Sequence, residues 1–248
     1  MSYNKWYIYE ALLKESGLKE NIPETYKFTK DNFFKMLELH NEIIIKPIYG
    51  LGGKGVRKVT KMDNGGFKIH HENVKSIIKD KNSLYDYLND IEAKQKKSFI
   101  IQKCISLAKM NGRPIDIRNI VQRKKGTTDW MVTGKYAKVA REGYLVTNFK
   151  SGGAVLSIDQ AFEKSNIKDV NMRKTLQVLD QVSLLATECL SKHFKKQTIW
   201  GYDLAVDEEG HVWIIEANRF PLISLFRRLD DLSMYETIIS IKDYNKKQ

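Results

Sequence analysis

Proline and cysteine are scarce in this chain, whose 248 residues include four prolines and two cysteines. No linker rich in Pro, Gly or Ser divides the sequence, and no internal repeat or low-complexity segment stands out. Cys104 and Cys189 lie far apart and form no C-x-x-C pair, so we interpret them as reduced thiols of a cytosolic protein. The five histidines form no H-E-x-x-H pattern, which argues against a zinc site.

Long apolar runs are missing as well. No stretch approaches the ~18 apolar residues that a membrane-spanning helix needs, and residues 1–16 carry charges throughout, unlike a signal peptide. Hydrophobic residues make up 42% of the chain and charged residues 29%, which is typical of soluble globular proteins. A chain of this length buries a sizeable core, as one large domain or as two lobes. We therefore expect a soluble cytoplasmic protein with no membrane partner.

Basic residues outnumber acidic ones and give the chain a formal net charge of +12. Such a charge favours anionic partners, which include phosphates, acidic substrates, nucleic acid and membrane surfaces. The simpler interpretation is a solvated basic surface, and the short basic runs within 94–97 and 123–125 fit it. No recognised nucleic-acid module or basic and aromatic stripe is present, which argues against nucleic acid. Arg227 and Arg228 are compatible with an acidic or peptide substrate, or with the solvated face of a last helix.

The spacing of apolar residues predicts a mixed α+β fold. Helices are expected at 4–16, 31–39, 73–80, 83–93 and 171–193, with a final helix that begins near residue 221. Strands are expected at 43–47, 56–60, 67–71, 98–102, 115–123 and 130–139, followed by a hairpin of 199–206 and 212–217. We expect two lobes, an N-terminal lobe of residues 1–103 and a C-terminal lobe of residues 104–248.

A glycine-rich loop follows the first predicted strand. Gly50, Gly52 and Gly55 match G-x-G-x-x-G, which is a weak signal by itself. A dinucleotide fold needs a helix directly after the last glycine, whereas segment 56–60 is strand-like. A P-loop needs Ser or Thr after its lysine, and Lys54 is followed by Gly55. Two interpretations remain: a hairpin whose backbone N–H groups cover a triphosphate, or a glycine-rich turn without a ligand.

Lys46 ends the strongly apolar strand that precedes this loop. A lone charge in such a strand is costly unless it is paired. A phosphate or a purine nitrogen is a good partner for it. The alternative is a lysine at a strand end whose ammonium group reaches solvent.

The hairpin of residues 201–218 is the most informative stretch. With a turn between Glu208 and Glu209, Asp203 would lie opposite Ile214, and Val206 opposite His211. Because side chains alternate by two along a strand, one face then collects four residues: Asp203, Ile214, Glu216 and Asn218. The rest of the hairpin is apolar, with Leu204, Val206, Trp213, Ile215 and Ala217 expected on one face and Ala205, Val212 and Ile214 on the other.

Two acids in so apolar a strand pair need compensation. A magnesium ion would supply it, because it takes carboxylate and amide oxygens and bridges to nucleotide phosphates. The alternative is a structural ion pair of Glu216 with a nearby Arg or Lys, such as Arg118. The amide of Asn218 favours the metal, since it suits a metal better than it suits an ion pair.

These residues together resemble the ATP-grasp superfamily. Glu216-Ala217-Asn218 with Pro221 is similar to its E-x-N-x-x-P ending, and Asp203 matches its first metal carboxylate. The remaining matches are Ile45-Lys46-Pro47 with Gly52-Gly53-Lys54-Gly55-Val56, Phe99-Ile100-Ile101-Gln102-Lys103, and Asp116-Ile117-Arg118. Within the superfamily the chain most resembles the YheC/YheD endospore-coat-associated group, through Pro23-Glu24-Thr25, Trp130-Met131-Val132-Thr133-Gly134, Val146-Thr147-Asn148-Phe149 and Gly152-Gly153. The resemblance covers nearly the whole chain.

The resemblance implies an ATP-grasp fold, in which two α+β lobes clasp ATP between antiparallel sheets. It also implies roles for single residues. Lys46 would bind the α- or β-phosphate, Lys54 with Gly52, Gly53 and Gly55 would cover the γ-phosphate, and Gln102, Lys103 and Ile105 would lie at the adenine. Asp116 would face the ribose. Arg118, helped by Arg141 or Lys138, would bind the phosphates or an acyl-phosphate, and Asp203, Glu216 and Asn218 would hold one or two Mg²⁺ ions.

By this resemblance the chain is an ATP- and magnesium-dependent carboxylate–amine ligase that acts through an acyl-phosphate and forms an amide or peptide bond. A phosphotransferase, or a nucleotide-binding coat-associated protein without turnover, remains an alternative. Two departures concern the substrate side. ATP-grasp ligases usually carry a further N-terminal domain, which leaves room for a partner protein that supplies it. Relatives that ligate glutamate place an arginine shortly before the N-x-x-x-G-G stretch, where this chain has Val146.

Overall fold

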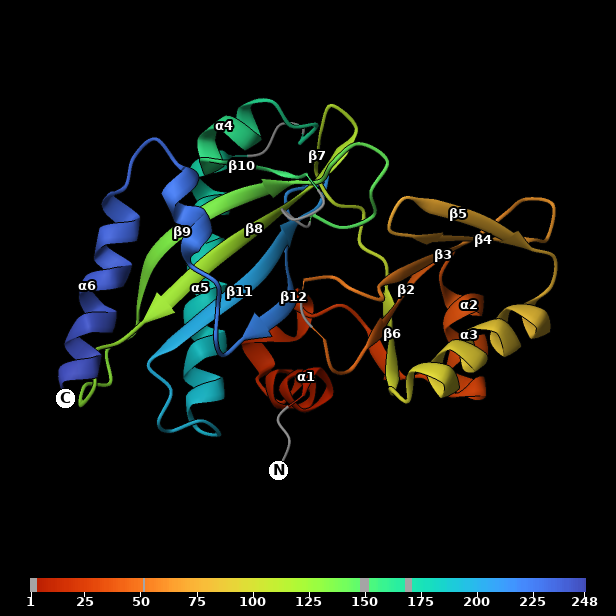
Figure 1. Ribbon diagram of the computed structural model, residues 1–248, viewed down its shortest axis with the longest axis horizontal. Helices are drawn as coiled ribbons and strands as arrows, with labels where there is room; N and C mark the ends of the chain where they lie inside the picture. Colours follow the sequence, from red (N-terminus) through yellow and green to blue (C-terminus); the bar gives the residue numbers. More distant parts are fainter. Residues whose placement is uncertain (1–3, 51, 148–151, 168–170) are drawn as a thin grey trace.

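The computed structural model describes residues 4–50, 52–147, 152–167 and 171–248, and two antiparallel sheets lie side by side in it (Figure 1). The first sheet has the order β1-β6-β2-β3-β4-β5, with β1 (Thr25–Lys27), β2 (Glu42–Pro47), β3 (Arg57–Lys61), β4 (Phe67–His71), β5 (Val74–Ile78) and β6 (Phe99–Lys103). The second has the order β10-β9-β8-β11-β12, with β8 (Arg113–Gln122), β9 (Met131–Val139), β10 (Ala154–Leu156), β11 (Ile199–Val206) and β12 (Val212–Asn218). A short β7 (Lys109–Met110) pairs with β8.

Alternation along β2 and β6 gives the first sheet an apolar face and a cleft face. Ile43 and Ile45 point into the core with Ile101, where α2 (Lys30–Leu39) and α3 (Lys81–Gln95) cover the sheet (Figure 1). Residues at the even positions, which include Lys46 and Gln102, therefore point to the opposite face, toward the second lobe. Both helices begin at a capping side chain, since the Thr29 side chain accepts from Asn32 N and the Asp80 side chain from Ser83 N.

The second sheet is covered on both faces. Helix α5 (Met172–Ser191) packs on one face, against Leu204, Ile117 and neighbouring core residues, and α4 (Ile158–Glu163) lies beside it. The 3₁₀ helix η3 (Ser224–Arg228) and α6 (Ser233–Lys247) cover part of the other face, where Phe226 contacts Tyr136 with ring centroids 4.7 Å apart. The remainder of that face, near β11 and β12, looks toward the first sheet (Figure 1).

The first helical segment of the chain belongs to the core of the second lobe. Helix α1 (Lys5–Leu13) and the 3₁₀ helix η1 (Ser16–Asn21) place Leu12 and Leu18 in the same buried cluster as β11, β12 and α5. In Figure 1, α1 lies below β12, between the two sheets. The two sheets themselves divide between residues 103 and 109, and the division of the whole chain into 1–103 and 104–248 stays a prediction.

Two predicted helices are wrong. Segment 73–80 contains β5, which pairs with β4 from Phe67 opposite Ile78 to His71 opposite Val74. The turn between them is tight, since Glu72 adopts φ 55, and β-branched residues at 74, 77 and 78 favour a strand over a helix. The last helix begins at Ser233 instead of near residue 221, because η3 intervenes. Among the described residues, no helix is both long and apolar enough to cross a membrane.

Candidate functional site

A β-bulge shapes the hairpin of β11 and β12. Asp203 lies opposite Glu216, whereas Leu204 lies opposite Ile214, so Ile215 is an extra residue without a partner on β11. The predicted register is therefore wrong. The turn shifts it by one residue, so that Val206 lies opposite Val212 instead of His211, and the bulge adds a second, so that Asp203 lies opposite Glu216 instead of Ile214. Ile214 faces the buried cluster around Leu204 instead of sharing the face of Asp203. Val212 likewise lies opposite Val206 in that cluster, instead of on the other face.

The predicted convergence of polar side chains nevertheless holds. Asn218 lies opposite Gly201, two residues from Asp203, so Asp203, Glu216 and Asn218 share one face. Asn218 Nδ2 donates to Asp203 Oδ2 over 3.2 Å. The bulge itself preserves this arrangement, because it takes up the residue that would otherwise turn Glu216 and Asn218 to the core.

Basic side chains of β8 and β9 complete the cluster around Asp203. Arg118 is the register partner of Asp203 on β8, and its Nη2 lies 2.9 Å from Asp203 Oδ1. Lys138 Nζ lies 3.0 Å from the same oxygen and 2.8 Å from Asp116 Oδ1. Asp116 also accepts a short hydrogen bond from the Thr147 hydroxyl group. The four charged groups form one continuous, largely buried network.

The two carboxyl groups of this network respond to it in opposite ways. Burial by itself would raise the pKa of Asp203, but Arg118 and Lys138 outweigh it and hold that pKa below the ordinary value. Burial prevails at Asp116 and raises its pKa, although Lys138 opposes the shift. The Nε of Arg118 is buried and lacks a hydrogen-bond partner among the described residues. Arg118 thus keeps one unused donor next to the carboxylate that it neutralises.

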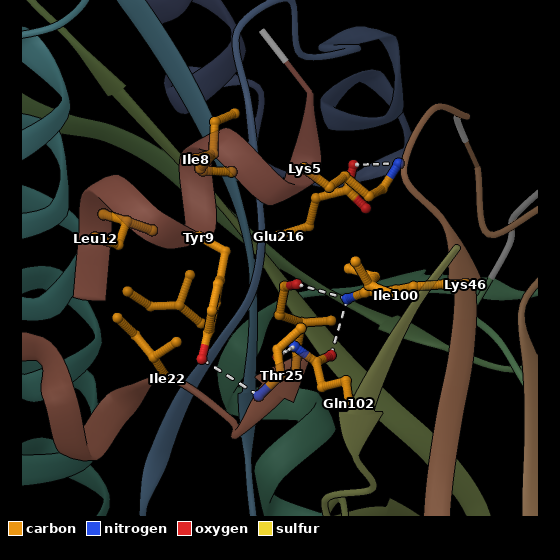
Figure 2. A pocket seen from close by; sticks show the side chains of 13 residues that line it. Lys5, Ile8, Tyr9, Leu12, Ile22, Thr25, Lys46, Ile100, Gln102 and Glu216 are labelled. Atoms are coloured by element: carbon orange, nitrogen blue, oxygen red, sulfur yellow. Dashed lines mark hydrogen bonds and ion pairs between the residues drawn. The ribbon is translucent and has the colours of Figure 1, made fainter. Parts of the chain in front are cut away.

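Lys46 connects the first sheet to this hairpin. Its Nζ donates to Gln102 Oε1 over 2.8 Å and to the carbonyl oxygen of Ile215 over 3.2 Å, as Figure 2 shows. That carbonyl belongs to the bulge residue, so the bulge makes it available to the other lobe. Gln102 Nε2 in turn donates to the Thr25 hydroxyl oxygen over 2.9 Å. Burial lowers the pKa of Lys46 to about 8, so the alternative of an ammonium group that reaches solvent is wrong.

The glycine loop rests against the second lobe. Gly53 adopts φ +70, and a Cβ atom there would lie 3.0 Å from Val146 Cγ2. Gly55 has φ +82 and leaves similarly little room against Pro47, and Gly52 also has a positive φ. Two further contacts join the lobes nearby: Leu145 N donates to Glu72 O, and His70 Nε2 lies 3.1 Å from Gly143 O. The described parts of the two lobes are therefore closed onto each other.

Two small hollows lie between the described parts of the lobes. The first has a volume of about 40 Å³ and lies among α1, β6 and β12, and Figure 2 shows its lining. The second, of about 20 Å³, is lined by Lys5, Lys46, Pro47, Gly50, Gly53, Lys54, Val56 and Glu216. Pockets that hold small molecules measure about 300–1,000 Å³. Neither of these two hollows is large enough to hold a nucleotide in this arrangement of the lobes.

The remaining predicted site residues lie at different distances from this centre. Lys103 and Ile105 lie at the crossing from β6 to the second lobe, where Lys103 Nζ lies 5.8 Å from the Trp213 ring centre. Lys54 is exposed on the glycine loop. Arg141 is exposed in the loop after β9, with its guanidinium 5.6 Å from the ring centre of Tyr144, and no described contact joins it to Arg118 or Lys138. Asn148, of the N-x-x-x-G-G stretch, lies outside the described residues.

The structure adds two residues that the sequence patterns missed. Lys5 Nζ lies 3.6 Å from Glu216 Oε1, and Thr147 bonds Asp116. Thr147 stands beside a recognised motif and could have been found there. The contact of Lys5 with Glu216 could not be predicted, because the sequence of a helix does not indicate which distant strand its first residue contacts. The sequence-based alternative, an ion pair of Glu216 with a nearby Arg or Lys, is met by Lys5. Arg118, the partner suggested for it, pairs with Asp203 instead.

The donor set on the hairpin fits a magnesium ion. No group of three or more His, Cys, Asp or Glu side chains that could hold a metal occurs within the described ranges. Asp203 and Glu216 are direct cross-strand partners, and Asn218 adds an amide on the same face. Magnesium is commonly bound through one or two carboxylates and completes its shell with water and substrate phosphates. Two carboxylates and an amide meet that requirement without a third acid.

Comparison with known proteins places this geometry in context. A family model described as YheC/D-like ATP-grasp matches residues 2–245. The chain is 25% identical over 229 residues to the endospore coat-associated protein YheD of Bacillus subtilis (strain 168), covering 90% of this chain and 49% of YheD. It is 23% identical over 225 residues to YheC of the same organism, covering 88% of this chain and 60% of YheC. The chain thus spans about half to three fifths of the length of these relatives.

A solved structure shares the fold. D-alanine–D-alanine ligase from Bacillus anthracis, complexed with ATP, superposes with a TM-score of 0.55 and 16% identity, over 99% of this chain and 68% of the ligase. At this identity the likeness concerns the fold.

Proposed function

The chain belongs to the YheC/D-like ATP-grasp family, and from that premise we propose that it is an ATP- and magnesium-dependent carboxylate–amine ligase. One observation carries the proposal. Lys46, the candidate phosphate ligand of the first lobe, bonds the carbonyl oxygen of Ile215, directly before the candidate metal ligand Glu216. The hydrogen bond thus joins the two halves of the proposed nucleotide site, and the Asp203 network lies beside it.

Each side chain has a role in this proposal. When the lobes part, adenine would enter beside Gln102, Lys103 and Ile105, with Asp116 at the ribose. Lys46 would bind the α- or β-phosphate, and Lys54 with Gly52, Gly53 and Gly55 would cover the γ-phosphate. Asp203, Glu216 and Asn218 would hold magnesium, which when bound offsets the charge of the phosphates.

Arg118 and Lys138 would act at the transferring phosphoryl group. A carboxylate oxygen of the substrate would attack the γ-phosphorus, the bond to the β–γ bridging oxygen would break, and ADP would leave. The amine nitrogen would then attack the acyl carbon, phosphate would leave with the C–O bonding electrons, and the amine would lose a proton. The unused Nε–H of Arg118 could bind the negative charge that develops on the phosphoryl oxygens or the tetrahedral intermediate. Arg141 would help only if the loop after β9 brought it nearer.

The proposal leaves the carboxylate and the amine open. The basic surface is compatible with an acidic or peptide substrate, and a partner protein could supply further substrate contacts. Cys104 and Cys189 are both free thiols, which is compatible with the proposed cytoplasmic location. YheD and YheC are named endospore coat-associated proteins. For this chain, association with the endospore coat is the alternative to a cytoplasmic location.

The test presents the protein with ATP, Mg²⁺, a panel of carboxylates and hydroxylamine, and it measures ADP and hydroxamate. Hydroxylamine captures an acyl-phosphate, so a ligase yields a hydroxamate in proportion to ADP. Glu216→Gln should lose both products while its far-UV circular dichroism stays unchanged. Glu209→Gln, at an exposed position in the turn of the same hairpin, is the matched control and should keep wild-type rates.

Three outcomes separate the alternatives. ADP with a stable phosphorylated product and no hydroxamate would identify a phosphotransferase. Nucleotide binding without ADP across the whole panel would identify a protein without turnover. Wild-type rates in Glu216→Gln would show that the metal assignment is wrong.

A further inference from the structure

Lys5 is held at the junction of the two lobes by three contacts. Its Nζ donates to the carbonyl oxygen of Gly50 over 2.6 Å and lies 3.6 Å from Glu216 Oε1 (Figure 2). Its backbone N donates to Ile48 O, and the neighbouring Asn4 side chain donates to the Tyr49 hydroxyl group. Helix α1 packs on the second lobe, yet its first residue thus contacts the strand end and glycine loop of the first.

Lys5 borders both hollows between the lobes. On the glycine-loop side, the lining includes three ammonium groups, those of Lys5, Lys46 and Lys54, and one carboxylate, that of Glu216. The neighbouring carboxylate of Asp203 does not balance this excess, because Arg118 and Lys138 already pair with it. Two positive charges are in excess over negative ones in the described lining, so the chemistry of this hollow suits an anion.

We propose that Lys5, the first residue of α1, is a third phosphate-binding lysine of the nucleotide site. When no nucleotide is bound, it pairs with Glu216 and donates to the Gly50 carbonyl oxygen. The inference rests on the proposed function and deepens it. A metal ion held by Glu216 would repel an ammonium group 3.6 Å from the same carboxylate, so Lys5 would lose its one anionic partner among the described residues there and keep only the neutral Gly50 carbonyl. The phosphates of a bound nucleotide would offer it a new anionic partner.

The geometry favours this role over that of a fixed structural ion pair. The side chains of Lys5 and Glu216 keep 16% and 24% of their exposure, so neither is locked in a dry interior. A separation of 3.6 Å is also longer than the 2.7–2.9 Å of a tight charge-assisted hydrogen bond. Lys5 can therefore leave Glu216 at little cost and keep the support of α1.

The test compares Lys5→Met and Lys5→Arg with Lys14→Met, a control at the exposed C-terminal end of the same helix. Titration calorimetry with Mg²⁺ measures binding of adenosine and of an ATP analogue with a non-hydrolysable β–γ bridge. Loss of one charge-assisted contact should weaken the binding of the analogue by roughly tenfold to a hundredfold in Lys5→Met. Adenosine should bind unchanged, Lys5→Arg should recover most of the affinity, and Lys14→Met should match wild type.

Each other outcome overturns the inference. Equal affinity of Lys5→Met and wild type for the analogue would show that Lys5 does not contact the phosphates. Tighter binding by Lys5→Met would show that Lys5 only competes with the metal. Equal losses for the analogue and for adenosine would show that Lys5 only supports the fold.

One substitute variant and two comparisons with wild type keep the result interpretable. If Lys5→Met failed to fold by circular dichroism, Lys5→Gln, which keeps a donor for the Gly50 carbonyl, would take its place. If wild type bound the analogue and Lys5→Met bound it equally, the inference would fall and the proposed function would stand. If wild type and Lys14→Met both bound no nucleotide, the proposed function itself would fall, and the role of Lys5 with it.

Discussion

Replacement of Lys46 by methionine should change how the stability of the protein depends on pH. Methionine keeps most of the apolar stem and removes the ammonium group. Lys46 as a residue is 6% exposed, and burial lowers the pKa of its ammonium group to about 8. In the unfolded chain the same group has an ordinary pKa of 10.5. Between these two values the unfolded chain holds the proton and the folded chain does not. The free energy of unfolding of wild type should therefore rise with pH across this window.

The size of the effect follows from the two pKa values. A fall from 10.5 to about 8, at about 1.4 kcal/mol for each pH unit, corresponds to roughly 3 kcal/mol. Wild type lacks this contribution to the free energy of unfolding below pH 8 and has all of it above pH 10.5. Lys46→Met lacks the titrating group, so it should gain nothing in this window from position 46. It also leaves Gln102 Oε1 without its donor, which costs about 1–3 kcal/mol at every pH.

Urea unfolding monitored by circular dichroism at pH 7, 8, 9 and 10 measures the difference between wild type and Lys46→Met. The difference should grow in favour of wild type by about 2–3 kcal/mol from pH 7 to pH 10. Lys54→Met, at an exposed site on the glycine loop, should run parallel to wild type. A difference between wild type and Lys46→Met that stayed constant with pH would refute the argument that Lys46 is a buried, desolvated ammonium group.

Two further predictions concern neighbouring positions. A Cβ atom at Gly201 would overlap Pro221 and lie 3.0 Å from Arg118 Nη1, so Gly201→Ala should destabilise the protein by about 1–3 kcal/mol and slow ADP release at least tenfold. Urea unfolding and the ADP assay measure both effects. Gly66→Ala is the control for the added methyl group, because Gly66 has no positive φ and its Cβ atom would come no nearer than 3.3 Å to another residue. Unchanged stability and rate in Gly201→Ala would contradict the packing argument. Burial raises the pKa of Cys104 to about 11, so its alkylation by iodoacetamide at pH 8 should be roughly a hundredfold slower than in the urea-unfolded chain. Mass spectrometry of peptides at several pH values checks this, and equal rates in the folded and unfolded chains would exclude it.

The fold class and the family could be predicted because they depend on patterns that local sequence carries. The apolar run 43–47 was expected as a strand and is β2, and the three polar residues of the last hairpin converge on one face as expected. The register of that hairpin was predicted wrongly for two reasons. The turn is one residue longer than expected, since Val206 pairs with Val212, and the bulge at Ile215 leaves no mark on the alternation of side chains. Segment 73–80 was assigned to a helix because a short apolar run fits both the helical and the strand periodicity. Its pairing with β4, which local sequence does not show, makes it a strand.

The ionic partners could be predicted only in part. Arg118 was expected near the hairpin, yet the sequence does not tell which carboxylate it meets, since that depends on the register between β8 and β11. Lys5 and Glu216 are 211 positions apart in the chain, and only the packing of α1 on the second lobe brings them together. The assigned roles of Asp203, Glu216 and Asn218 as metal ligands stay a prediction that calorimetry and the ADP assay can test.

The packing of α1 on the second lobe also determines how the molecule can open. The chain leaves the second lobe after η1 and returns to it after β6, so the first sheet is carried as an insertion on two tethers. These tethers enter the sheet side by side, with Thr25 opposite Gln102 and Lys103 N bonded to Glu24 O over 2.8 Å. A lobe joined by one strand can rotate about several axes. A lobe joined by two hydrogen-bonded neighbouring strands is restricted to rotation about the single axis that the two tethers define. The β4–β5 turn lies at the edge of the sheet remote from β1 and β6, so it would move farthest when the lobes part.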